Sequence, residues 1–350
     1  MPRAPQRAAA PLLGHDDGLH LSGTVLWFDS PRQRDLCFIS HAAAMARPLA
    51  HRKVLASAPT FRLLQECTTE AQRLPSPFFR PFCLGELELE LLPAGFLPGS
   101  AQLLVGWRKT RILYAADIAM HPARAAEAIR IHRCDLLIMS CTLGDPELHL
   151  PPRRALEEEL LSFVRQSLAL GRSPVLLADR LGLAQELLQL LDEAGIPVRS
   201  HRAIARHAAA YVELGHPLPV ASFLGPARPE QPPAALIWPL ELHASPTLAR
   251  LQPRPLLAVV GEQALPEKKR WLPGSLPLEC AIPLTPHAGF DELCSYVQAA
   301  APQRVLLHRG QVHAFRRALQ ERGYEVELVL GPQQASLEEW PPSANPRAVE

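Results

Sequence analysis

The sequence predicts a mixed α/β protein, with a strand-rich first part and a second part in which strands and helices alternate. Residues 86–92 alternate Glu and Leu, the pattern of a strand with one face in water. Leucines and other apolar residues recur at helical spacing over residues 153–169. Proline accounts for 37 of the 350 residues. Because proline interrupts helices, this content excludes a long helical bundle and favours short elements joined by rigid loops.

The first part is predicted to consist mainly of strands. Short apolar runs bounded by turn residues predict buried strands, and two such runs around the charged turn at residues 107–109 predict a hairpin. The predicted strands cover residues 23–29, 35–40, 53–57, 86–92, 101–106, 110–115 and 136–139.

The second part is predicted to form a small parallel sheet with helices. Pro152 suits the start of a helix over residues 153–169, and Gly171 suits its end. Alternating strands and helices are typical of parallel α/β layers. Further helices are predicted over residues 184–195, 204–214, 290–300 and 312–322, and strands over residues 175–178, 196–199, 236–240, 256–260, 280–284, 304–307 and 326–329.

The composition limits the classes of protein to which the chain can belong. Apolar residues make up 47% and charged residues 20%, which is typical of a globular protein with one large or two ordinary domains. Lys and Arg number 36 against 35 Asp and Glu, so a protein that coats nucleic acid through bulk charge is disfavoured. No apolar run approaches the roughly 18 residues of a membrane span, and we expect no membrane partner.

The cysteines and the two ends of the chain favour a cytoplasmic protein. The seven cysteines are scattered and form no CxxC pair, so we expect reduced thiols rather than disulfides or a zinc knuckle. Residues 1–17 are predicted to be a disordered tail rather than a signal peptide. Residues 332–350 are polar and proline-rich and are predicted to be a second tail.

Several familiar catalytic loops are missing from the sequence. It contains no GxGxxG or GxxxxGK[ST] phosphate loop, no GxSxG nucleophile elbow, no HExxH and no EF-hand loop. Nucleotide binding through those loops and ordinary serine hydrolysis therefore have no support.

Seven segments that border predicted strands and helices occur in a more specific order. They are residues 40–46 (SHAAAMA), 92–101 (LPAGFLPGSA), 114–117 (YAAD), 134–144 (CDLLIMSCTLG), 182–188 (GLAQELL), 285–290 (TPHAGF) and 305–310 (VLLHRG). In this order they resemble the motifs of the β-CASP nuclease group of metallo-β-lactamase-fold proteins. The resemblance is greatest to the bacterial ligase-associated DNA exonucleases, relatives of messenger-RNA 3′-end processing factors, and it spans about residues 18–330.

The resemblance implies a fold and a division of the chain. The expected architecture is a metallo-β-lactamase-like αββα sandwich with an inserted β-CASP-like α/β domain. Residues 18–150 and a return segment, residues 273–331, would form the sandwich, and residues 151–272 the insertion. In the family, histidines and acids of these motifs hold two zinc ions, which activate a water for attack on a phosphodiester.

The chain departs from the family at most of the metal positions. Only His41 and Asp117 match metal ligands, and His287 matches the general acid. The remaining ligand positions hold Ala43, Met45, Ala46, Phe96, Ser140 and Arg309. Zinc needs three or four N, O or S ligands, so two retained ligands cannot hold two ions. We therefore expect no cofactor, unless other side chains rebuild a zinc site.

The retained residues also have structural explanations. A histidine after a buried strand often bonds to nearby backbone, and an aspartate at a strand end often forms a turn or a helix cap. His308 lies one residue before the matched histidine position. Because strand side chains alternate between faces, its ring is expected to point away from the site. A rebuilt site would have to use side chains such as Cys37, Cys141 or His308.

A basic cluster lies in the predicted insertion. Arg199, Arg202 and Arg206 occur with two histidines within nine residues that contain no acid. In the family this domain helps to form the groove for the nucleic-acid strand, so these arginines are candidates for phosphate contacts. The alternative is a solvated helix face.

These observations favour a catalytically degenerate relative of β-CASP nucleases. It would act as a non-catalytic subunit or a nucleic-acid-associated protein, with DNA or RNA and a catalytic homologue, a ligase or a helicase as partners. Two alternatives stay open. One is an active zinc-dependent exonuclease or other hydrolase with an altered site, and the other is a small-molecule binder that uses the emptied cleft.

Overall fold

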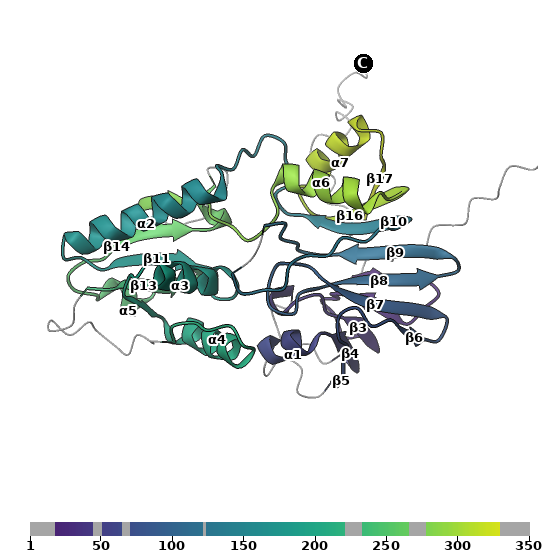
Figure 1. The fold of residues 1–350 in the computed structure, drawn as a ribbon, viewed down its shortest axis with the longest axis horizontal. Coiled ribbons are helices and arrows are strands. Elements are labelled where there is room, and N and C mark those ends of the chain that lie inside the picture. The colour runs from purple at the N-terminus through teal and green to yellow at the C-terminus, as the bar shows by residue number, and fades with distance from the viewer. Residues whose placement is uncertain are drawn as a thin grey trace, which may run out of the picture.

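Three β-sheets organise the protein, two packed face to face and the third beside them (Figure 1). The computed structural model describes residues 18–44, 51–64, 71–121, 124–220, 233–265 and 278–329. The predicted tails, residues 1–17 and 332–350, lie outside the described residues, as do Met45 and Ala46. The α/β class expected from the sequence is confirmed.

The first sheet comes from the start of the chain. Its strands are β1 (Leu19–His20), β2 (Leu26–Phe28), β3 (Leu36–Phe38), β4 (Lys53–Ala56) and β5 (Gln72–Pro75). They lie in chain order, and all neighbours except β1 and β2 are parallel. Helix α1 (Ala58–Leu64) follows β4. The Ser57 hydroxyl accepts a hydrogen bond from the Thr60 amide and so caps this helix.

The second sheet has seven strands in the order β17-β16-β10-β9-β8-β7-β6. They are β6 (Phe82–Leu84), β7 (Leu87–Pro93), β8 (Ala101–Trp107), β9 (Thr110–Ala115), β10 (Leu136–Cys141), β16 (Arg304–Gly310) and β17 (Glu325–Leu328). The predicted hairpin is the antiparallel pair β8 and β9. From β9 onward neighbouring strands are parallel, so β9, β10 and β16 all end at one edge of the sheet.

Apolar side chains fill both faces of the second sheet. Phe28 and Phe38 of the first sheet pack against Tyr114, with ring centroids 4.7 and 6.1 Å apart, in the core between the two sheets. Helices α6 (Phe290–Ala300) and α7 (Val312–Glu321) cover the opposite face, where Tyr296 and Phe315 are fully buried. Burying such rings is a large part of the hydrophobic stabilisation of a fold.

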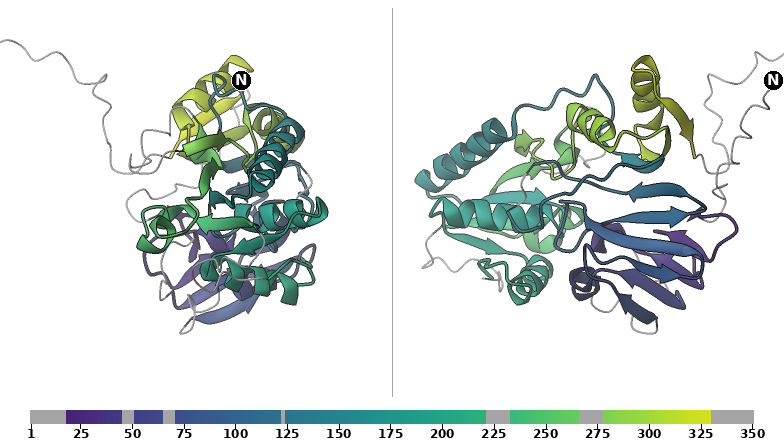
Figure 2. Two further views of the ribbon diagram at one scale, coloured as in Figure 1. Left: turned by 90° about the vertical axis from the view of Figure 1, so that its left-hand side faces the viewer. Right: turned by 45° about the vertical axis from the view of Figure 1, so that its right-hand side comes forward.

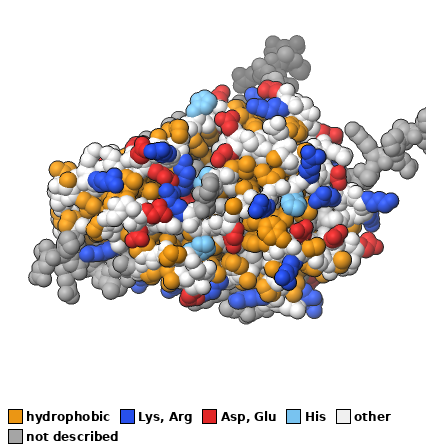
Figure 3. Space-filling view, in the orientation of Figure 1, with side chains coloured by type: hydrophobic (Ala, Val, Ile, Leu, Met, Phe, Trp, Pro, Cys, Tyr) orange, Lys and Arg blue, Asp and Glu red, His pale blue; other side chains and the backbone are white. Residues whose placement is uncertain are grey.

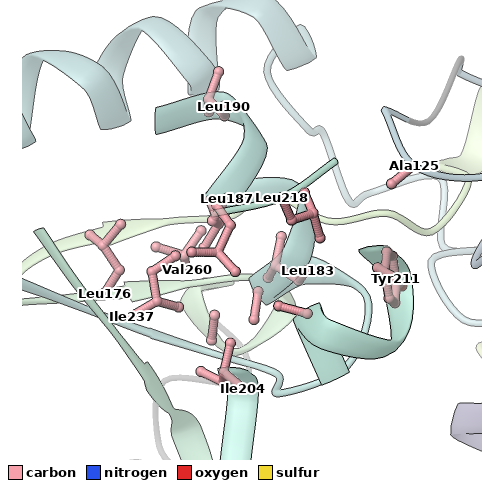
Figure 4. Close-up of a cluster of buried hydrophobic side chains, with 14 of the residues drawn as sticks. Ala125, Leu176, Leu183, Leu187, Leu190, Ile204, Tyr211, Leu218, Ile237 and Val260 are labelled. Atoms are coloured by element: carbon pink, nitrogen blue, oxygen red, sulfur yellow. The ribbon is translucent and has the colours of Figure 1, made fainter. Parts of the chain in front are cut away.

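The third sheet is entirely parallel, as the alternating pattern predicts. Its order is β12 (Val198–Ser200), β13 (Ala235–Pro239), β11 (Pro174–Ala178), β14 (Leu256–Val260) and β15 (Leu278–Ile282). The helices of this part are α2 (Arg153–Ala169), α3 (Leu183–Glu193), α4 (Arg202–Glu213) and the short α5 (Pro246–Ala249). Figure 4 shows Leu187 of α3 and Ile204 of α4 packed against Leu176, Ile237 and Val260 of the sheet.

The third sheet extends beyond the boundary that the sequence analysis places at residue 272. Its edge strand β15, residues 278–282, pairs with β14 and lies in the segment 273–331 that the resemblance assigns to the sandwich, so that division of the chain stays a prediction. The short elements β1, β5, β6 and α1 were not predicted. The predicted helix over residues 153–169 and the observed α2 have the same bounds.

Ion pairs connect the third sheet's helices to the rest of the protein. Arg124 donates two hydrogen bonds, 2.7 and 2.9 Å long, to the carboxylate of Glu157 on α2. Arg62 of α1 pairs with Glu213 of α4, and these helices lie side by side in Figures 1 and 2. Of the helices in the described ranges, none has the length and hydrophobicity to cross a bilayer.

Gly310 at the end of β16 is a position where a side chain should not fit. Its φ is +97°, and an added Cβ would lie 2.3 Å from the carbonyl oxygen of Cys141. We expect Gly310→Ala to lower the free energy of unfolding by about 2–4 kcal/mol, from backbone strain and the clash. Gly323→Ala is the control, since Gly323 also has positive φ (+87°) but no atom within 4 Å of the added Cβ. Urea unfolding should show the larger loss for Gly310→Ala, and equal losses would contradict this account.

Candidate functional site

A cleft of about 1140 Å³ lies between the second sheet and the elements of the third. It is lined by residues that follow the carboxyl ends of strands: His41 after β3, Asp117 after β9 and Arg309 near the end of β16. Residues after β11 and the start of α4 form the facing wall. Ligand sites in α/β proteins commonly occupy this position at the carboxyl ends of parallel strands.

Asp117 is the central charged group of the cleft. Its side chain is only 9% exposed, yet Arg309, His41 and His287 all approach its carboxylate. Burial opposes ionisation, but contacts with His287 and His41 outweigh it and hold the pKa of Asp117 well below its usual range. Asp117 is therefore a buried anion at neutral pH.

Arg309 makes the shortest contact to this anion. Its Nη2 donates a 2.7 Å hydrogen bond to Asp117 Oδ2, while the side chain stays 49% exposed to the cleft. A β-bulge brings it there. Leu307 pairs with Met139, but the next residue of β10, Ser140, pairs with Arg309, which leaves His308 as the extra residue.

His41 lies beside Asp117 on the floor of the cleft. It is 2% exposed, its Nε2 is 3.2 Å from Asp117 Oδ2, and its ring meets the edge of Phe96 at 5.0 Å between centroids. Phe96 occupies the position where the family carries a metal-binding histidine, so a hydrocarbon ring stands in that place. His41 Nδ1 has no hydrogen-bond partner within the described part of the chain.

His287 bridges two acids. Its Nδ1 contacts Glu262, in the 3₁₀ turn Glu262–Ala264 after β14, and its Nε2 is 3.8 Å from Asp117 Oδ2. Burial disfavours the charged ring, but the contacts with Asp117 and Glu262 prevail and raise the pKa of His287 to about 9. The ring is therefore an imidazolium at neutral pH and is able to donate a proton or a hydrogen bond.

His308 points away from the cleft floor. Its Nε2 is 3.2 Å from the Ser140 hydroxyl, and its ring stacks on Tyr114 in the interior. Burial and the nearby Arg309 lower its pKa to about 3, so it is neutral. Ser140, which stands at the position of a family acid, thus contacts His308.

The basic cluster divides between two places. Arg202 and Arg206 of α4 line the cleft opposite Arg309, as does Arg180 after β11. Arg199 lies on β12 and is not among the residues that line the cleft. Arg180 approaches Glu241, which follows the neighbouring strand β13, at 3.5 Å, with both side chains about half exposed.

The residues of the cleft do not fit a zinc pair. Among the described residues, the retained family positions His41, Asp117 and His287 carry donor atoms in the cleft, and Phe96, Ala43 and Arg309 stand at other ligand positions. Within the described residues, no group of three or more His, Cys, Asp or Glu side chains is arranged to hold a metal ion. The guanidinium on Asp117 is itself a cation, which would repel a second one.

Sequence analysis missed three groups of this site: Glu262, Arg180 and the pairing of Arg309 with Asp117. Glu262 and Arg180 follow the buried strands β14 and β11 by two residues. Because parallel strands end at the same edge of a sheet, this position was the available signal. The pairing of Arg309 depends on the bulge, which no pattern in the sequence indicates.

Among the curated relatives, one matches nearly the whole chain and others match only a part of it. The chain is 30% identical over 324 residues to a protein named probable DNA ligase from Opitutus terrae, a match that covers 88% of the chain and 30% of that relative. It is 30% identical over 119 residues to a probable RNase, MJ4, from Methanocaldococcus jannaschii, which covers 32% of the chain and 27% of that relative. The chain thus spans less than a third of the length of these two relatives.

The fold has a counterpart among solved structures. A protein of unknown function from Enterococcus faecalis V583 aligns with a TM-score of 0.57 at 16% identity, over 86% of this chain and 80% of that chain. No family model matches the chain. The similarity to the named relatives supports a relation of this chain to the β-CASP nuclease group whose motifs it resembles.

Proposed function

We propose that the chain is a non-catalytic, nucleic-acid-associated relative of the β-CASP nucleases, with a metallo-β-lactamase-like αββα sandwich and a β-CASP-like insertion. The observation that supports this most directly is the hydrogen bond from Arg309 to Asp117. A guanidinium takes the place of a ligand there and neutralises the retained carboxylate. Two packed sheets, with α6 and α7 on an outer face, agree with the proposed architecture.

The electrostatics of the cleft explain why the loss of ligands would be tolerated. A buried carboxylate without a cation is strongly unfavourable, and in a metal site the ion provides the compensating charge. Here Arg309 and the protonated His287 provide it. The floor is therefore stable as a protein surface and needs no bound ion to hold Asp117 ionised.

Nucleic acid is the proposed partner because of the wall that faces this floor. Arg180, Arg202 and Arg206 line the cleft on that side. Arginine is suited to phosphate groups because its planar fork makes paired hydrogen bonds. The face in Figure 3 shows positive and negative side chains interspersed, so the proposed contact depends on this local group and not on overall charge.

The first prediction of this proposal concerns metal content. Protein purified without a histidine tag should contain far less than one zinc ion per chain by elemental analysis. Folding would then gain no metal-binding free energy, so EDTA should leave the thermal midpoint unchanged. Close to two zinc ions per chain, or a midpoint that falls in EDTA and recovers with zinc, would contradict the proposal.

The second prediction concerns catalysis. We expect no cleavage of single-stranded or duplex DNA or RNA with added zinc or manganese. His287 can donate a proton, but general acid catalysis alone contributes about 10²–10⁴-fold, too little against the slow spontaneous reaction. A His287→Ala variant purified in the same way controls for contaminating nucleases. Cleavage by the parent that disappears in this variant would show a working active site.

The third prediction concerns pH. The pKa of His287 is raised in the folded state, so its stabilising effect is complete below about pH 6.5 and disappears as the pH rises through about 9. The raised value corresponds to at most about 3 kcal/mol. Urea unfolding between pH 6.5 and 9.5 should show a fall in stability that is smaller in His287→Gln. His313→Gln, at an exposed position on α7, should keep the fall of the parent. The same fall in both variants would exclude this role for His287.

A further inference from the structure

Arg309 has hydrogen-bonding capacity that the described part of the chain does not use. A guanidinium carries five N–H donors. Within the described residues its side chain makes one hydrogen bond, from Nη2 to Asp117, and half of the side chain is exposed. The remaining donors therefore lie at the surface of the cleft that Arg309 lines. Asp117 fixes the guanidinium in place, which reduces the entropy lost when a ligand binds.

A second polar group on the floor also lacks a partner. His41 is 2% exposed and lines the cleft, and its Nδ1 has no hydrogen-bond partner in the described part of the chain. Buried polar atoms in proteins nearly always have a partner, so this atom is available for a further hydrogen bond. The floor thus presents one fixed cation and one unsatisfied ring nitrogen.

The facing wall adds two more cations. Arg202 and Arg206 are exposed at the start of α4 and have no ion-pair partner among the described residues. Three acids line the cleft: Asp117, which contacts Arg309, Glu241, which lies 3.5 Å from Arg180, and Asp179 after β11. The backbone amides in the first turn of α4, which follow its His201 cap, strengthen the positive potential of this wall.

We propose that Arg309, fixed by Asp117, is the anchor for a phosphate group of a single-stranded nucleic acid, with Arg202 and Arg206 contacting the strand from the opposite wall. This inference rests on the proposed nucleic-acid association, and it specifies which side chain binds the phosphate group. A guanidinium fork donates paired hydrogen bonds to phosphate oxygens, so it can hold the group without a metal ion. No bond is formed or broken, and the strand stays intact.

The test is binding of internally labelled single-stranded DNA and RNA, measured by fluorescence anisotropy at several salt concentrations. Arg309→Gln should weaken binding about tenfold or more, because hydrogen bonds to charged groups contribute about 1.5–3 kcal/mol. It should also reduce the slope of log K against log salt by about 0.7. The matched control is Arg316→Gln, an exposed arginine on α7 outside the cleft, which should weaken binding by about twofold or less.

A second variant guards against loss of folding in Arg309→Gln. Arg309→Lys keeps a cation beside Asp117 but loses the fork, so it should weaken binding while leaving the salt slope unchanged. Oligonucleotides with a 5′-phosphate, a 3′-phosphate or neither identify the anchored group. If a terminal phosphate raises the affinity of the parent but not of Arg309→Gln, Arg309 holds the phosphate at that end of the strand. If Arg309→Gln loses the same affinity for all three oligonucleotides, Arg309 holds an internal phosphodiester.

The outcomes separate the two proposals. If the parent protein binds neither DNA nor RNA, the proposed nucleic-acid association is wrong, and this inference falls with it. If the parent binds but the Arg309 variants lose no more affinity than Arg316→Gln, the association stands and the anchor is wrong.

Discussion

A carboxylate that is nine-tenths buried must be compensated, and in this protein the position of several distant segments depends on that requirement. Asp117 gathers His41 from the end of the first sheet, Arg309 from the end of the second and His287 from the loop after the third. Each partner is separated from Asp117 by at least 76 residues of sequence. Asp117 is therefore the point at which residues from all three sheets meet, and removing its charge would leave a surplus of positive charge in a confined space.

Charged contacts also cross the interface between the two parts of the protein, beside a buried apolar core that joins Ala42 and Leu64 to the helices of the third sheet. His287 joins Asp117 to Glu262, which follows the third sheet's strand β14. Arg153 at the start of α2 reaches the Thr285 carbonyl and Glu186 of α3. These contacts place the basic wall of α4 opposite the floor, so the cleft is a product of folded geometry and not of residues adjacent in sequence.

Much of the fold could be predicted because the relevant forces are local. The helical spacing of leucines determined α2 to the residue, and the alternation at residues 86–92 marked β7. By contrast, β5 contains Gln72 and Arg73 and is mostly exposed, so no apolar pattern reveals it. The edge strand β15 is recognised as part of the third sheet only through its pairing with β14, a contact that sequence patterns do not report.

The sequence predicted which residues belong to the site better than it predicted the contacts between them. His41, Asp117 and His287 were identified because they match site positions of the family that the sequence resembles, and the structure brings these three together. The sequence identified Arg309 only as a missing ligand. Its pairing with Asp117 requires the strand register and the approach of β16 to β10, which depend on contacts between residues far apart in the chain.

The bulge in β16 has a consequence for how such a site changes during evolution. In a strand without the bulge, His308 would stand opposite Ser140, in the place that Arg309 now holds. His308 and Arg309 are adjacent in the sequence, and the one extra residue of the bulge determines which of them lies opposite Ser140. A single-codon deletion or insertion, with no substitution at all, would be enough to exchange the chemical group that faces this register position.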